Sequence, residues 1–203
     1  MLHQNYSHNM RLGADYFAGE KATIGVLLTG SYSDESDNTI SETNIGEAGN
    51  ATDVTQAILR ATNDMEGERG NFSANVNYRW QDGGKSWNID ADYGLFKNRR
   101  TSDQPNTYFD STGDNIIEER DFANITPTDI DIYSLKFDHE RPLWGGQLGM
   151  GMKAAYVRTD NTFDFYNVIG GEQILDLELS NQFVYKENVN AAYLSYGKQV
   201  QAW

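Results

Sequence analysis

Strict alternation of apolar and polar residues around a short turn is the feature that most constrains this chain. Residues 71–96, NFSANVNYRWQDGGKSWNIDADYGLF, contain two alternating runs on either side of QDGG. Side chains of a strand point to opposite faces with period two, so each run predicts a strand with one apolar face. The apolar members are Phe72, Ala74, Val76, Tyr78 and Trp80 before the turn, and Trp87, Ile89, Ala91, Tyr93 and Leu95 after it. This face must contact either a protein core or lipid.

The same alternation recurs along the chain and predicts an all-β, antiparallel up-and-down meander of about seven long strands. We expect them near residues 5–17, 21–33, 54–80, 86–100, 128–140, 147–159 and 178–200. Many of these exceed the mean strand length of about 5–6 residues. In the last strand Val189, Ala191 and Tyr193 alternate with Asn190, Ala192 and Leu194, so its two faces are not assigned.

Short turns and long polar stretches alternate between these strands. The turns AGEK, QDGGKS and RPLWGG, at 18–21, 81–86 and 141–146, are roughly 60 residues apart, which is a hairpin-scale spacing. We expect the stretches 31–53, 99–129 and 158–173 to be loops. Short turns at one end of long strands and long loops at the other are the layout of outer-membrane β-barrels.

Composition removes several function classes. Sixteen Lys and Arg against 30 Asp and Glu give a net charge of −14, which disfavours nucleic acid binding. The absence of Cys excludes disulfides and thiolate metal sites. No window approaches about 18 consecutive apolar residues, so a transmembrane helix is not expected, whereas a barrel strand needs only about 9–11 residues. The first 17 residues lack the pattern of a signal peptide, which suggests a cytoplasmic protein or an internal piece of a longer one.

The polar faces of the predicted strands carry amides and charges, as a water-filled barrel lumen allows. The lumen-facing candidates are Asn75, Asn77, Arg79, Asn88, Asp90, Asp92, Lys136 and Lys153. Asp90 and Asp92 share one strand face and could act as acid and base. Nothing else in the sequence supports hydrolysis, and for any single one of these residues simple hydration of a wide pore is the favoured explanation.

All four tryptophans lie beside predicted turns. They are Trp80, Trp87, Trp144 and Trp203. Because the indole ring is apolar and its N–H needs a wet partner, Trp favours the membrane interface, and we expect these residues to form an aromatic girdle. The alternative is that each Trp caps a strand end in a soluble sheet.

The remaining candidates concern ligands and metals. Five aromatic residues in the stretches expected to be loops are candidates for ligand contact, because aromatics concentrate at binding sites: Tyr108, Phe109, Phe163, Phe165 and Tyr166. They would otherwise pack between long hairpins. The acidic stretches 33–37 and 110–121 could coordinate calcium, but they lack the spacing of a known calcium loop, and solvated surface is favoured. Because His3, His8 and His139 have no metal-site partners, no metal, cofactor or catalytic site is expected.

Three stretches resemble the barrel region of TonB-dependent receptors, in the outer membrane protein beta-barrel family of Gram-negative bacteria. They are DIDIYSLKFDHERPL at 129–143, MKAAYVRTDNTFDFYN at 152–167 and NQFVYKENVNAAYLSYGKQ at 181–199. The resemblance implies an outer-membrane receptor whose long loops bind a bulky nutrient such as a siderophore, glycan, peptide or vitamin. Its expected partners are outer-membrane lipid, the TonB system, a plug domain and the nutrient.

Receptors of this kind have about 22 strands, a signal peptide and an N-terminal plug. The seven strands expected here therefore suggest that residues 1–203 are a single segment of a larger barrel, without plug domain or signal peptide. Two alternatives remain. One is a soluble or cell-surface β-sheet binding module, such as an adhesin or carbohydrate-binding domain; the other, disfavoured by the lack of a nucleophile and base pair, is a barrel enzyme.

Overall fold

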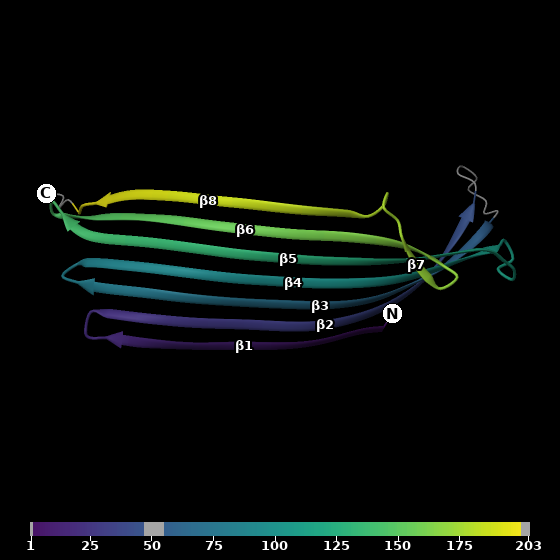
Figure 1. The fold of residues 1–203 in the computed structure, drawn as a ribbon, viewed down its shortest axis with the longest axis horizontal. Helices are drawn as coiled ribbons and strands as arrows, with labels where there is room; N and C mark the ends of the chain where they lie inside the picture. Colours follow the sequence, from purple (N-terminus) through teal and green to yellow (C-terminus); the bar gives the residue numbers. More distant parts are fainter. Residues whose placement is uncertain (1, 47–54, 200–203) are drawn as a thin grey trace.

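The computed structural model of the chain describes residues 2–46 and 55–199, which form one antiparallel sheet of eight strands (Figure 1). The strands are β1 (Leu2–Ala18), β2 (Ala22–Gly46), β3 (Thr55–Asp82), β4 (Lys85–Asp110), β5 (Ile116–Leu143), β6 (Gly146–Ile169), β7 (Glu172–Leu175) and β8 (Asn181–Gly197). Strands β1 to β6 each pair with the next in sequence, and both β7 and β8 pair with β6. The predicted all-β antiparallel meander is confirmed. Within the described ranges, no helix is long and apolar enough to cross a membrane.

Strands β7 and β8 together form the last limb of the meander. Leu175 at the end of β7 is opposite Tyr166, and Asn181 at the start of β8 is opposite Phe163, so both lie along the same edge of β6. At the interruption between them, the Ser180 hydroxyl accepts a hydrogen bond from the Phe165 N–H at 2.9 Å. The sheet therefore has seven limbs, and the eighth strand results from this local break.

The three stretches expected to be loops are mostly strand, so this prediction is wrong. Strand β2 continues to Gly46, β4 to Asp110 and β6 to Ile169. The β6–β7 hairpin closes through only two residues, Gly170 and Gly171, with φ of 61° and 85°. Alternation reveals a strand only when one face is apolar, whereas these segments carry polar residues on both faces and still satisfy their backbone groups by pairing. The segment 47–54 lies outside the described residues.

Tight turns close the hairpins at the opposite end of the sheet, which we call the turn end (Figure 1). Asp82 pairs with Lys85 across Gly83 and Gly84, whose φ values are 54° and 79°. Positive φ at both central residues is the requirement of a type I′ turn, whose twist matches that of the flanking strands. The β5–β6 turn has the same form, with Trp144 at φ 48° followed by a glycine at φ 75°. We call the other end of the sheet the loop end.

Around several glycines the side chains are closer on the polar face than on the apolar face, although Gly146, on the apolar face at the β5–β6 turn, is also crowded. A Cβ added to Gly25 would lie 2.8 Å from Asp15 Oδ1, and one added to Gly149 would lie 2.7 Å from the Ser195 hydroxyl. These glycines are on the polar face. On the apolar face, a Cβ at Gly30 would meet nothing nearer than 3.8 Å, and one at Gly70 would meet nothing within 4 Å. This difference is expected for a curved sheet whose polar face is concave.

The sheet is open in the described residues. Strand β1 pairs only with β2, and β8 pairs only with β6. With seven limbs, β1 and β8 run in the same direction, so they cannot pair antiparallel with each other. Closure of an antiparallel barrel would need an odd number of further strands between them. The described residues form a single layer, so no second sheet covers the apolar face, as a soluble sandwich would require.

Candidate functional site

Across β1 to β6 the apolar face forms a continuous band at the turn end, whereas on β8 the same face carries Asn188 and Asn190. One row across the sheet consists of Ala14, Val26, Val76, Ala91, Leu135 and Ala154, which are neighbours in the strand register. On β4 the band runs from Trp87 to Leu95, and the next outward residue on that face is Lys97. At about 3.3 Å per residue this is about 26 Å of strand, which matches the 9–11 residues of a tilted membrane strand.

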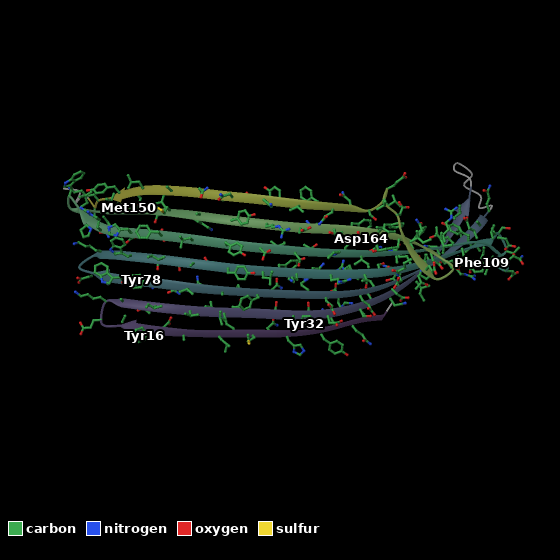
Figure 2. The ribbon with its side chains drawn as sticks, viewed as in Figure 1. Tyr16, Tyr32, Tyr78, Phe109, Met150 and Asp164 are labelled. Carbon is green, nitrogen blue, oxygen red and sulfur yellow. The ribbon has the colours of Figure 1, made fainter. Side chains whose placement is uncertain are left out.

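The described tryptophans lie at the turn-end border of this band. Trp80 and Trp87 are direct neighbours across β3 and β4, and the Trp87 ring lies 4.7 Å from the His139 ring. Trp144 sits at the tip of the β5–β6 turn with 82% of its surface exposed. Trp203 lies outside the described residues. Figure 2 places Tyr16 and Tyr78 near this same end.

A second aromatic row, which the sequence analysis missed, borders the band on the loop-end side. The rings of Phe72, Tyr93, Tyr133 and Tyr156 follow one another across β3 to β6, with centroid separations of 6.4, 5.1 and 6.4 Å. These residues are far apart in the sequence, so only the register aligns them. A usable signal existed, because Tyr133 and Tyr156 are each the last apolar-face residue before a charged one. We call this set the tyrosine row.

All eight lumen-facing candidates lie on one face, opposite Trp80 and Trp87. Arg79 is paired with Asn88, and Asn75 with Asp92. The row between them joins Asn77, Asp90, Lys136 and Lys153. The structure therefore brings the predicted group together; that it lines a lumen stays a prediction.

The polar face is a hydrogen-bonded wall rather than a set of isolated charges. Asp92 accepts a bond of 2.6 Å from the Asn75 amide, and Asp90 accepts one of 2.7 Å from Asn88. Lys136 pairs with Asp138 at 2.6 Å.

In the same wall, the Tyr193 hydroxyl reaches across Gly151 to donate to Asp138 at 2.8 Å. This contact also assigns β8, since it places Tyr193 on the polar face and Leu194 with the apolar band. In the three rows from β3 to β8, the carboxylates Asp90, Asp92 and Asp138 are matched by Arg79, Lys136 and Lys153. From β3 to β8 these three rows therefore carry equal numbers of positive and negative side chains.

A hollow of about 400 Å³ lies at the turn end of this wall, lined by Arg79, Gln81, Ser86, Trp87, Asn88, Asp138, Glu140 and Tyr193.

The five ligand-contact candidates are in strands and not in loops, which corrects their predicted location. Tyr108 and Phe109 belong to β4, and Phe163, Phe165 and Tyr166 belong to β6. Register places Tyr108, Phe163 and Phe165 on the polar face, and the other two on the opposite face. Figure 2 shows Phe109 toward the loop end. They are therefore two groups, and contact with a ligand stays a prediction for both.

The acidic stretch 110–121 closes a hairpin. The Asp110 carboxylate accepts hydrogen bonds from the Thr112 hydroxyl and the Asn115 amide, both at 2.6 Å. These bonds hold the pKa of the Asp110 carboxyl well below its usual range. The stretch 33–37 lies within β2. In residues 2–46 and 55–199, no three His, Cys, Asp or Glu side chains are grouped so that they could hold a metal ion.

The arrangement of an apolar band between aromatic borders, with a polar opposite face, is that of a transmembrane β-barrel wall. No curated protein matches the chain. Residues 78–203, well over half of the sequence, match the outer membrane protein beta-barrel family. The chain belongs to this family, and its place is the outer membrane.

Proposed function

We propose that the chain is part of the barrel wall of a TonB-dependent receptor that takes up a bulky nutrient and catalyses no reaction. The observation that carries this proposal is the length of the hairpins beyond the apolar band. On β4 the strand continues from Phe96 to Asp110, about 50 Å at about 3.3 Å per residue. A barrel that only fills the membrane has no need of such extensions, whereas a receptor needs a large surface to bind its ligand.

The polar wall supports the same function. A balanced, hydrogen-bonded face such as that around Asp90 and Lys136 stays hydrated and offers a ligand or a plug domain exchangeable polar contacts. The seven limbs leave two unpaired edges, so the proposal includes further strands that complete the barrel. The proposed partners are outer-membrane lipid, a plug domain, the TonB system and the nutrient, with no nucleic acid.

Energised uptake is tested in cells that carry the full-length receptor. We expect deletion of the receptor to abolish growth on one nutrient class supplied at limiting concentration, and deletion of TonB to reproduce that loss. Crosslinking of the receptor to TonB should increase when the nutrient is present. Loss of growth on deletion of the receptor without the same loss on deletion of TonB would contradict the proposal.

A further inference from the structure

A hollow without ionisable groups lies on the polar face near the loop end. It has a volume of about 260 Å³, and we call it the amide hollow. Its lining residues are Thr39, Ser41, Ala61, Thr62, Asn63, Gln104 and Asn106. The chain has 46 charged residues and a net charge of −14, so a hollow lined only by uncharged residues distinguishes this part of the polar face from its surroundings.

Among the described residues, no Lys or Arg near the amide hollow is left without an acidic partner, and the nearest carboxylate is Asp37, two residues from Thr39 on the same face, with His3 Nδ1 at 3.2 Å. On its membrane side Arg100 bonds to Glu35 at 2.7 Å. On its far side Arg120 makes two bonds to Glu118, at 2.7 and 3.0 Å. A ligand in the hollow therefore meets uncharged lining residues, with an ion pair on either side and one carboxylate, Asp37, beside Thr39, so an anionic ligand finds no free positive partner there.

The amides of the hollow are held in position by one another. The Ser102 hydroxyl, which is buried, donates to Asn63 Oδ1 and accepts from the Gln104 amide at 3.0 Å. The Asn106 side-chain amide donates to the backbone carbonyl of Gln104 at 2.9 Å. Each side-chain amide has two donor hydrogens and an acceptor oxygen, so each keeps capacity for a ligand while its orientation is fixed.

Aromatic rings continue the same face beside the amide hollow. Gln104 is the direct cross-strand neighbour of Phe122. The Phe122 ring lies 5.4 Å from that of Phe165, which lies 6.4 Å from that of Phe163. Phe163 is 37% exposed. We call these three residues the phenylalanine wall; with the hollow, it places amides and apolar ring faces next to each other.

We propose that the amide hollow and the phenylalanine wall together bind a neutral oligosaccharide, which deepens the proposed receptor function and rests on it. Sugar hydroxyls both donate and accept hydrogen bonds, which matches amides and hydroxyls. The apolar C–H faces of the sugar rings pack on aromatic rings, which provide large flat apolar surfaces. An anionic ligand would lose its hydration here without a free partner of opposite sign, and that loss is costly.

The test uses the full-length receptor purified in detergent and an array of neutral oligosaccharides of three to eight units. The Gln104→Ala and Phe165→Leu variants should each weaken binding of the array's best ligand at least about tenfold. The leucine variant keeps an apolar side chain and removes only the ring. Tyr32→Leu is the matched control, because Tyr32 is an exposed aromatic residue on the opposite face of the sheet, and it should leave the affinity unchanged.

Two results separate the inference from the function on which it rests. A folded receptor that binds none of the neutral oligosaccharides overturns the inference, and TonB-dependent growth on ferric citrate or peptides in that case leaves the receptor function intact. Oligosaccharide binding that Gln104→Ala and Phe165→Leu do not weaken overturns the site. Oligosaccharide binding by a receptor that neither crosslinks to TonB nor needs it for growth contradicts the receptor function instead.

Discussion

The same strands have one apolar face at the turn end and two polar faces at the loop end. At the turn end, β3 alternates between apolar residues such as Val76 and polar ones such as Asn77. Even-numbered positions lie on the apolar face there, and odd-numbered positions lie on the polar face. At the loop end, β3 carries Asp64 on one face and Asn63 on the other, so both faces are polar. The backbone pairing is the same throughout, so only the surroundings of the two faces have changed.

Contact of one face with lipid, and not strand pairing, therefore accounts for the alternation of apolar and polar residues at the turn end. Where one face meets hydrocarbon, a polar residue there is costly and the alternation is strict. Where both faces meet water, as around Asp64, each position is free to serve another purpose. The loop end is accordingly where an uncharged binding surface such as the amide hollow could develop without loss of stability.

The strongest test of this comparison introduces a charge at both ends. Val76→Arg should lower the free energy of unfolding in bilayers by about 2–4 kcal/mol, because Val76 is central in the apolar band. Thr101→Arg, on the same face at the loop end, should change it by less than about 0.5 kcal/mol. Urea titration of the full-length protein refolded in liposomes measures both. Equal costs would show that the apolar face at the turn end does not meet lipid.

A second test compares the crowded and open faces. Gly151→Ala should cost about 1–3 kcal/mol, because the added Cβ would collide with Tyr193 and Asp138 and break their hydrogen bond. Gly70→Ala should be neutral or slightly stabilising, since nothing lies within 4 Å of its Cβ and Ala loses less backbone entropy. The same titration applies. A neutral Gly151→Ala would mean that the polar face is not the concave one.

Much of the turn end could be predicted from the sequence. The strand limbs, the shared face of residues such as Asn75 and Lys136, and the grouping of the described tryptophans at one end all follow from local alternation and turn residues. Each of these features depends only on a few neighbouring positions in the sequence. Predicting them therefore did not require knowing which strand pairs with which.

Which residues align across the strands depends on register and could not be predicted, although local alternation marks Tyr133 and Tyr156 each as the last apolar-face residue before a charged one. The tyrosine row joins residues up to 84 positions apart, from Phe72 to Tyr156, and only the pairing aligns them. The faces of β8 became clear only through the bond between Tyr193 and Asp138. Phe165 and Tyr166 lie in a strand rather than in the predicted loop, so these adjacent residues face opposite ways.

A third test concerns the tyrosine row. Tyr133→Ala should cost about 1 kcal/mol in bilayers, because its ring contacts those of Tyr93 and Tyr156 and lies at the border of the apolar band. Tyr6→Ala is a suitable control, since Tyr6 lies beyond the band on the same face and is 67% exposed. If both substitutions cost the same, the tyrosine row has no special role at the membrane border.

The smallest effect is expected at the hairpin tip closed by Asp110. Asp110→Ala should speed amide hydrogen exchange at Thr112 and Asp114, whose N–H groups donate to the carboxylate, and leave the unfolding midpoint unchanged.

The pKa of Asp110 is lowered in the folded state, so its stabilising contribution is present above the ordinary carboxyl pKa and is lost only as the pH falls through the folded one. Between about pH 7 and about pH 5 the exchange pattern of the wild-type tip, corrected for intrinsic rates, should stay constant. Opening of the tip within that interval would show that another group holds it closed. A change in the global midpoint on Asp110→Ala would mean that the loop end and the turn end unfold as one unit, which the difference between their surroundings argues against.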